Sequence, residues 1–258
     1  MKTIAMLNAK GGVGKTTSAL CFADILARDY DKRVLVIDLD AQRNTGSQLG
    51  AGGCEIGVDT LLLDKDADIR ELIRHTPFER IDVLPCTTRL EEANLKVLLD
   101  TSSVQQFRLK RHLRRVSGDY DYCILDCPTA IKNISTINGL AFTDDVLVPL
   151  TADDYSLQGL TDIVAVINDV KEYNDEIDLR GCFITQWENN NCHKAVATQL
   201  VDALGNRAYK THIRKAVKVK EATFTPGSLI DFARNCRQYR TTVRWSRNTW
   251  RRTKQWFH

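Results

Sequence analysis

The fold is decided at Lys10-Gly11-Gly12-Val13-Gly14-Lys15-Thr16-Thr17, which lies between an apolar run at 3–8 and an Ala/Leu-rich segment with helical spacing. A strand, a glycine-rich turn and a helix in this order are typical of a phosphate-binding loop. Three glycines within four positions let backbone N–H groups point at a polyphosphate, and the helix N-terminus adds its positive end. Lys15 can serve phosphate oxygens and the Thr16 hydroxyl can serve Mg²⁺. The stretch therefore predicts a polyphosphate site.

Aspartates follow two further apolar runs. The run at 33–38 contains four consecutive apolar residues and ends in Asp38, with Asp40 close behind; the run at 122–126 ends in Asp126. Such runs suit strands of a parallel sheet that is buried on both faces. The carboxyl ends of parallel strands meet at one edge, so we expect these aspartates beside the phosphate loop. Asp126 fits the carboxylate that holds a magnesium-bound water.

The remaining pattern alternates between strands and helices. The helix after the loop carries an apolar stripe and ends near residue 30. Helices are predicted at 90–99, 105–116 and 189–204, strands at 81–85, 181–185 and 208–213, and loops at 52–53 and 64–68. Short connections of this kind predict an α/β fold, a doubly wound and mainly parallel sheet with helices on both faces.

Size and composition favour one large cytosolic domain. The chain has 258 residues, of which 43% are apolar and 27% charged. It begins its first strand without a signal-peptide pattern, and no run approaches the roughly 20 apolar residues of a membrane span. Eight cysteines are scattered without a C-x-x-C pair, which favours buried thiols over a zinc site or a disulfide framework.

Positive charge gathers near the C-terminus. Residues 207–258 carry 14 Lys and Arg against two acids, a net charge of +12, whereas residues 1–206 carry a net charge of −9. This asymmetry indicates contact with DNA or with an anionic membrane surface. The helix at 105–116 is also basic; we interpret it as a solvated face, with help in DNA binding as the alternative.

The loop departs from the standard P-loop, which requires glycine where Ala9 stands, and a second lysine, Lys10, precedes the glycine pair. The pattern K-G-G-x-G-K-T-T resembles the deviant Walker A box of the ParA/MinD superfamily of P-loop ATPases. The segment 38–44 resembles that family's D-x-D-P-Q-x-N, in which the second aspartate positions the attacking water. The resemblance implies that Lys10 reaches the partner subunit's nucleotide and that Asp40 orients the water.

The resemblance extends over about residues 2–240, where 137–141, 145–149 and 156–160 resemble the family's helix, strand and following helix. It also implies the other site residues. It implies ATP as ligand, with Mg²⁺ at Thr16, Asp38 and Asp126. The expected catalytic residues are Lys10, Lys15 and Asp40. The nucleotide would contact Lys10, Gly11, Gly12, Val13, Gly14, Lys15, Thr16, Thr17, Thr185, Ile213 and Arg214. Partition ATPases place DNA-binding cations where this chain has Arg214, Lys215, Lys218 and Lys220.

Two family signatures are incomplete. The family continues D-x-P-P-S after its Walker B aspartate, whereas Cys127-Pro128-Thr129-Ala130 keeps only the first proline. Relatives carry I-P-R-N beside the base, whereas this chain reads Ile213-Arg214-Lys215-Ala216, and the missing proline removes a fixed φ. Nitrogenase-reductase relatives bridge a dimer through cysteines, and Cys127 lies near the nucleotide site.

The function implied is that of a short, Soj-like partition ATPase. Such a protein forms a homodimer with ATP, binds DNA without sequence preference, is stimulated by a ParB-like centromere-binding protein and moves DNA cargo during plasmid, chromosome or mobile-element segregation. It is expected in the cytoplasm, associated with the nucleoid when ATP-bound. The P-loop begins at residue 10, which leaves no room for a preceding helix-turn-helix domain. Two alternatives stay open: a MinD-like ATPase that cycles on membranes, and a non-enzymatic nucleotide-binding regulator.

The last residues differ from the family ending. We expect one ATPase domain over 1–240 and a basic aromatic tail over 241–258, where residues 242–258 hold five cations, no acids and three of the four tryptophans. The tail is interpreted as a DNA-binding or disordered extension, as a weak membrane anchor, or as a frameshifted ending. The third reading rests on a second frame over Val243–Lys254 that permits an acidic, apolar helical pattern like the family's own.

Overall fold

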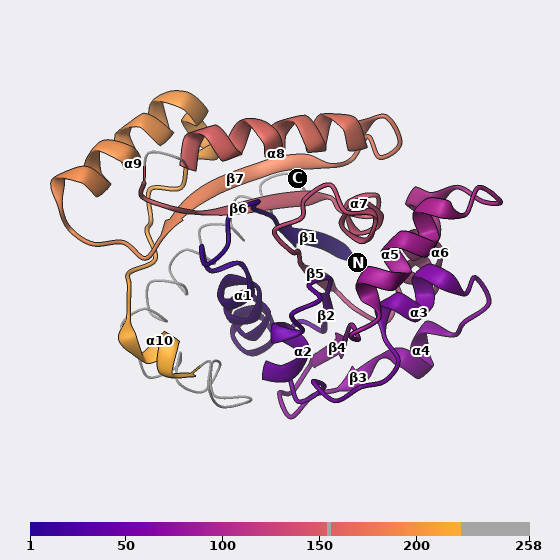
Figure 1. Ribbon diagram of the computed structural model, residues 1–258. Coiled ribbons are helices and arrows are strands. Elements are labelled where there is room, and N and C mark those ends of the chain that lie inside the picture. Colours follow the sequence, from indigo (N-terminus) through magenta and orange to yellow (C-terminus); the bar gives the residue numbers. More distant parts are fainter. Residues whose placement is uncertain (154–155, 223–258) are drawn as a thin grey trace.

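The computed structural model describes residues 1–153 and 156–222. Its centre is a seven-stranded sheet in the order β3-β4-β2-β5-β1-β6-β7, parallel throughout except where β3 pairs with β4 (Figure 1). The strands are β1 (Lys2–Met6), β2 (Val34–Asp38), β3 (Arg74–His75), β4 (Ile81–Leu84), β5 (Tyr122–Asp126), β6 (Asp145–Thr151) and β7 (Asp178–Thr185). The predicted doubly wound, mainly parallel sheet is confirmed.

Helices cover both faces of the sheet. They are α1 (Lys15–Tyr30), α2 (Asn44–Gln48), α3 (Val58–Leu63), α4 (Ile69–Leu72), α5 (Leu90–Leu99), α6 (Arg108–Arg115), α7 (Ile134–Leu140), α8 (Ser156–Lys171), α9 (Asn191–Leu204) and α10 (Val217–Ala222), with 3₁₀ turns at Gln105–Phe107 and Gly205–Arg207. Among the helices of the described residues, none is long and apolar enough to cross a bilayer.

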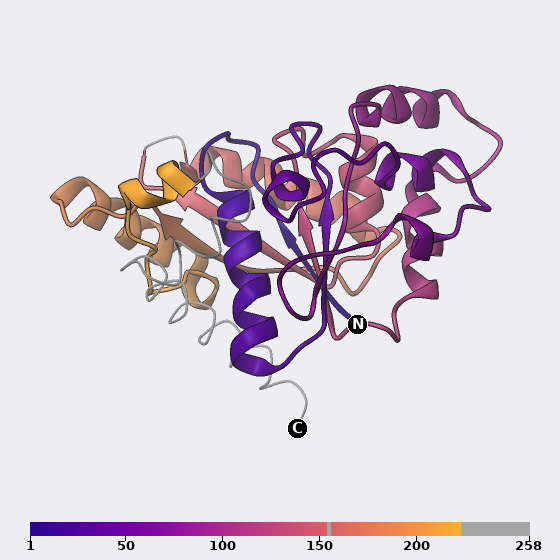
Figure 2. The same ribbon diagram turned by 90° about the horizontal axis from the view of Figure 1, so that it is seen from below.

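Alternation along the strands divides the core into two layers. Ile4 and Met6 on β1 belong to a cluster with the apolar stripe of α1, whereas Ala5 belongs to a cluster with residues of α3, α5, α6, α7 and α8. Successive side chains of a strand point to opposite faces, so a wholly apolar strand fills both layers. Figure 2 shows α1 running along one side of the strands.

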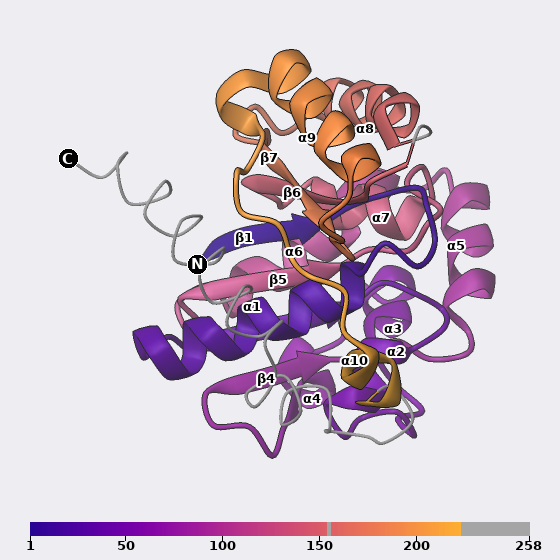
Figure 3. The same ribbon diagram turned by 90° about the vertical axis from the view of Figure 1, so that its left-hand side faces the viewer.

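The start of α1 is the point where the site is assembled. In Figure 1, α2 and α10 lie on either side of α1, and Figure 3 shows both of them near the end of α1 where the phosphate loop enters it. The register places Met6 beside Asp126, and Asp126 beside Asp38, so β1, β5 and β2 end together. The predicted gathering of carboxyl ends beside the phosphate loop follows from this register.

The strand predicted at 208–213 is wrong. The segment makes only an isolated bridge between Ala208 and Cys182, with Tyr209 N–H donating to the Cys182 carbonyl and Ile213 N–H to the Ile184 carbonyl. The two acceptors are two residues apart on β7, whereas the donors are four residues apart. Two extra residues must therefore bulge out of register, which prevents a regular ladder.

The observed elements also differ from the predicted ones at two places within residues 58–116. The helices α3 and α4 and the strand β3 were not predicted, because each spans only two to six residues. The helix predicted at 105–116 begins as a 3₁₀ turn, and its Arg111, Arg114 and Arg115 lie on a solvated face as expected, whereas Arg108 does not. Arg108 is buried and donates to the Leu62 carbonyl at 3.0 Å, while Arg111 and Arg114 are exposed.

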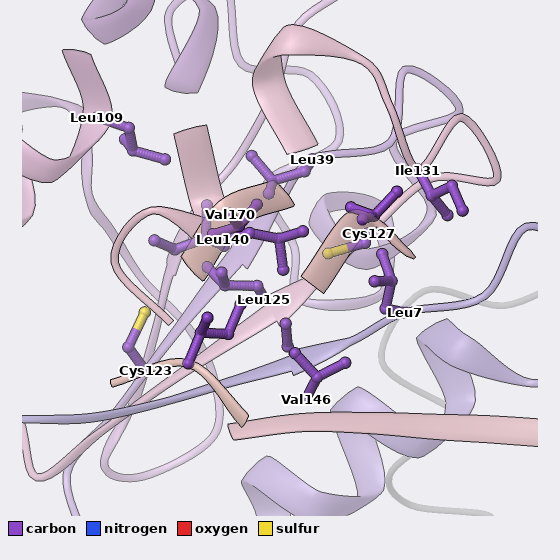
Figure 4. Close-up of a cluster of buried hydrophobic side chains, with 14 of the residues drawn as sticks. Leu7, Leu39, Leu109, Cys123, Leu125, Cys127, Ile131, Leu140, Val146 and Val170 are labelled. Atoms are coloured by element: carbon purple, nitrogen blue, oxygen red, sulfur yellow. The ribbon is translucent and has the colours of Figure 1, made fainter. Parts of the chain in front are cut away.

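Cys127 lies in the core and not at a surface that a second subunit could reach. Figure 4 shows its side chain in the apolar cluster that also includes Leu7 and Ile131. Its exposure is 0%, and burial raises the pKa of its thiol. A thiol in this position cannot bridge two subunits, so Cys127 does not match the cysteines through which nitrogenase-reductase relatives bridge a dimer.

Candidate nucleotide site

The phosphate loop has the backbone that its glycines permit. Gly12 and Gly14 have φ of 74° and 90°, in the left-handed region that L side chains rarely adopt. Gly14 is the N-cap of α1, so the loop passes straight into the helix N-terminus. The free N–H groups of the first turn and the helix dipole then face the same space, which favours an anion there.

Lys15 is the buried cation of this loop. Its exposure is 7%, and its ammonium donates to the Lys10 carbonyl at 3.1 Å, which bends the side chain back over the loop. Burial lowers the pKa of Lys15, while the nearby Asp126, Cys127 and Asp40 act in the opposite direction. Burial disfavours the charged form of Lys15, and a phosphate bound beside the ammonium would stabilise that form.

Asp126, at the end of β5, accepts two hydroxyl hydrogen bonds on one oxygen. Thr16 Oγ1 and Thr45 Oγ1 each donate to Asp126 Oδ2 at 2.7 Å. Burial raises the pKa of this carboxyl, and the two hydroxyls oppose the rise. The other oxygen, Oδ1, is buried and has no hydrogen-bond partner within residues 1–153 and 156–222.

This arrangement fits a magnesium ion. An orphaned carboxylate oxygen next to the Thr16 hydroxyl, at the mouth of a phosphate loop, offers the hard oxygen donors that Mg²⁺ prefers. Thr16 and Asp126 are the residues that would hold the ion. Within the described ranges, no group of three or more His, Cys, Asp or Glu side chains could hold a metal ion.

Asp38 organises the loop that follows β2. Its Oδ1 accepts from the backbone N–H of Asp40 at 3.1 Å and its Oδ2 from that of Gly46 at 2.8 Å. Burial, then the adjacent Asp126, raises the pKa of Asp38. Through these two hydrogen bonds Asp38 fixes the conformation of the loop. Its predicted role as a magnesium ligand stays a prediction. Asp40 is half-buried, and its Oδ1 accepts from Gln42 N–H at 3.0 Å.

The loop and the strand ends line a cleft of about 650 Å³, within the ordinary range for small-molecule sites. Asp40 borders it on the side of α2, and Ile213 on the side of α10. The predicted residues on its wall are Gly11, Gly12, Gly14, Lys15, Thr16, Thr17, Asp40, Thr185, Ile213 and Lys215. Of the others that are described, Val13, Asp38 and Asp126 are buried beneath it.

Thr185 and Gln186, at the end of β7, support the phosphate loop from below. Thr185 Oγ1 contacts the carbonyls of Val13 at 2.7 Å and of Leu150 at 3.1 Å, and Gln186 Nε2 donates to the Gly12 carbonyl at 2.6 Å. Thr185 also lines the cleft, so its predicted contact with adenine stays a prediction. Sequence reasoning missed Gln186, whose only signal was its place directly after Thr185.

Lys10 lies at the edge of the cleft and folds onto its own chain. Its ammonium pairs with Asp153 and lies 3.4 Å from Thr151 Oγ1, both at the end of β6. The pair is only partly buried, with side-chain exposures of 45% and 35%. Such a pair contributes about 0–1 kcal/mol, so a more highly charged partner could displace Asp153.

The predicted DNA contacts lie beyond β7. Arg214 is exposed, and Lys215 pairs with Glu188 at 2.7 Å. Lys218 and Lys220 belong to α10, but their side chains lie outside the described residues, as does the tail at 241–258. The structure therefore brings the phosphate-site residues together at one place, whereas of the four predicted DNA contacts it describes only Arg214 and Lys215.

The sheet, the glycine loop and the lysine and carboxylates around the cleft define a P-loop nucleotide-binding protein. Comparison with known proteins adds the family. The family described as an AAA domain matches residues 1–179. The chain is 35% identical to the sporulation initiation inhibitor protein Soj of Bacillus subtilis over 225 residues, which cover 86% of this chain and 87% of that protein. It is 36% identical to the chromosome partitioning protein ParA of Myxococcus xanthus over 76% of this chain and 69% of that one.

The chain therefore belongs to the ParA/MinD superfamily of deviant Walker A P-loop ATPases and is similar to its short Soj/ParA members. A solved structure agrees with this fold. The cobyrinic acid a,c-diamide synthase of Mycobacterium smegmatis, solved with bound ADP and magnesium, superposes with a TM-score of 0.80 at 25% identity and covers 97% of this chain.

Proposed function

We propose that this chain is a magnesium-dependent, ParA-like partition ATPase. ATP would close two copies into a nucleotide-sandwich dimer that binds DNA without sequence preference, and hydrolysis would return the monomer. The observation that carries the proposal is that Lys15, Thr16 and Asp40 line one cleft, that Thr16 donates to the buried Asp126 behind it, and that Lys10 directly precedes Gly11 of the cleft wall. A degenerate, non-enzymatic site would not be expected to keep all five groups.

The chain's residues divide the chemistry among them. Backbone N–H groups of the loop and the Lys15 ammonium hold the phosphates and favour the charge that develops on the transferring phosphoryl group. Thr16 and Asp126 would hold Mg²⁺, which would supply positive charge beside the nucleotide phosphates. Asp40 borders the cleft on the side of α2 and would orient the attacking water, since one of its oxygens is fixed by Gln42 N–H.

Lys10 would couple dimerisation to hydrolysis. In the single chain it is held by Asp153, an exposed pair of low strength. In the proposed dimer it would leave Asp153 and reach the nucleotide of the partner subunit, whose phosphates carry more charge than one carboxylate. The switch from its own aspartate to the partner's phosphate would make turnover depend on assembly.

The proposed partners follow from the family and from the charge pattern. Arg214, Lys215, Lys218 and Lys220 would contact DNA phosphates, and a ParB-like centromere-binding protein would stimulate hydrolysis. The net charge of +12 over residues 207–258 supports an anionic partner. We expect the protein in the cytoplasm, on the nucleoid when ATP-bound and not on membranes.

One experiment separates this function from its alternatives. Purified protein is mixed with ATP or ADP, with or without Mg²⁺, and its binding to plain duplex DNA and to anionic phospholipid vesicles is measured beside phosphate release. We expect Mg-ATP-dependent binding to DNA, with slow hydrolysis. Binding to vesicles and not to DNA would support a MinD-like cycle, and nucleotide binding without any hydrolysis would support a regulator.

A further inference from the structure

Thr45 is a buried hydroxyl at the nucleotide site to which neither the sequence patterns nor the proposed mechanism gives a role. It stands in the first turn of α2, has an exposure of 0% and donates to Asp126 Oδ2 at 2.7 Å. Thr16, the residue that would hold magnesium, donates to the same oxygen at the same distance. Two hydroxyls from different elements therefore fix one carboxylate oxygen.

These two hydrogen bonds fix the orientation of the Asp126 carboxylate. An ionised carboxylate has about four lone-pair positions, and two donors on Oδ2 use the two on that oxygen. The carboxylate can then rotate only by breaking both bonds, and its free Oδ1 is held in place as the remaining acceptor. With Thr16 as its only donor, Asp126 could turn together with the Thr16 side chain, and Thr45 prevents that.

Thr45 also joins the two halves of the site. The loop between β2 and α2 is closed by Asp38, which binds the N–H groups of Asp40 and Gly46. Thr45 is the neighbour of Gly46 and reaches from this loop to β5, whose Asp126 lies in register with Asp38. The loop that carries Asp40 is therefore tied to the carboxylate that would serve the metal ion.

We propose that Thr45 is a positioning residue that presets Asp126, and with it Thr16, for Mg²⁺ bound to ATP. The inference rests on the proposed function, because it concerns the metal of the same site. Hydrogen bonds that orient metal-binding groups without touching the ion typically change metal affinity by about 10- to 100-fold when they are removed. The prediction concerns the affinity for Mg²⁺ and not the affinity for the nucleotide alone.

The test uses the full chain, a fluorescent non-hydrolysable ATP analogue and a Mg²⁺ titration. Thr45→Val removes the hydroxyl at nearly constant shape, and Asp126 keeps its bond from Thr16, so the variant is expected to fold. Thr45→Ser restores the hydroxyl without the methyl group. Thr143→Val is the matched control, because Thr143 is equally buried and donates to the Gly139 carbonyl at 2.9 Å, at the end of α7.

We expect Thr45→Val to raise the Mg²⁺ concentration at half-saturation by about 10-fold or more, while its affinity for the analogue in EDTA changes less than about twofold. Thr45→Ser and Thr143→Val should stay within about threefold of the original chain. A normal Mg²⁺ titration in Thr45→Val, or an equal defect in Thr45→Ser, would overturn the assignment. If the original chain binds the analogue without any Mg²⁺ dependence, the proposed function itself fails, and the Thr45 assignment fails with it.

Discussion

The two ends of the cleft are built differently. At the phosphate end, Lys15, Asp38 and Asp126 are buried and each makes contacts with other groups of the site. At the other end, Lys215 on the cleft wall and the neighbouring Arg214 are exposed, on a segment that makes isolated bridges to Cys182 of β7 and to Trp187 just after it. At the phosphate end, the groups form a hydrogen-bonded network in which each side chain fixes the position of another. At the other end, each residue is held by its own separate contacts.

This difference indicates where a single substitution should have a large effect on stability and chemistry. Removing one member of a buried network leaves its partners without hydrogen bonds, which costs about 1–3 kcal/mol for each unsatisfied group. When an exposed residue is removed, water can form hydrogen bonds with its former partners. The free energy of unfolding therefore changes little. We therefore expect substitutions at the phosphate end to act strongly on chemistry and stability, and those at the other end to act weakly and one at a time.

The largest effect is expected for Asp40→Ala. Positioned bases of this kind contribute about 10²- to 10⁴-fold to a rate, so turnover should fall by that factor while affinity for ATP stays nearly unchanged. ATP-bound dimers should accumulate, as light scattering would detect. Asp64→Ala is the control, because Asp64 accepts from Asp66 N–H at 2.8 Å in a similar turn away from the cleft. Normal turnover in Asp40→Ala would move the water-positioning role to another residue.

A smaller effect is expected for Thr185→Val, which tests whether the end of β7 belongs to the network. The substitution deprives the Val13 and Leu150 carbonyls of a buried donor, so the free energy of unfolding should fall by about 1–3 kcal/mol. Affinity for ATP should fall as well, because the Val13 carbonyl is part of the phosphate loop. Chemical denaturation and nucleotide titration measure both quantities. An unchanged affinity would separate Thr185 from the phosphate end.

The smallest effect is expected at the exposed cations. Arg214→Ala should weaken DNA binding by the same small factor for every sequence and reduce the salt slope of log K by about 1, because one phosphate contact is lost. Lys215→Ala should do less, since Lys215 is already paired with Glu188. Equilibrium binding to several duplexes between low and high salt measures this. A loss that depends on DNA sequence would contradict a phosphate contact.

The sequence predicted the phosphate end far better than the other end. Lys15 and Thr16 occur at fixed spacings within the glycine loop, and Asp126 ends an apolar run that predicts a parallel strand, so these three residues could be placed together in advance. Thr45 was missed because its contact with Asp126 spans 81 residues and has no local signal. The segment 208–213 was predicted as a strand because its composition does not reveal the two residues that bulge out of register.

The pairing of Lys10 with Asp153 could not be predicted either, because it joins two loops that follow different strands. The resemblance predicted only the state in which Lys10 serves a partner subunit. The structure of one chain adds the state in which this lysine is retained by its own aspartate. To predict both positions of Lys10 from the sequence, one would have to compare the energy of the dimer with that of the monomer.

The most direct test of the account is the mass of the protein with ATP, measured by sedimentation, for Lys10→Ala and for the matched control Lys96→Ala, which removes a similarly exposed lysine paired with Glu92. We predict that the original chain and Lys96→Ala form dimers with Mg-ATP and hydrolyse it. Lys10→Ala should bind ATP through Lys15 and the loop amides, remain a monomer and lose turnover. A Lys10→Ala protein that still dimerises and hydrolyses ATP normally would contradict the central claim.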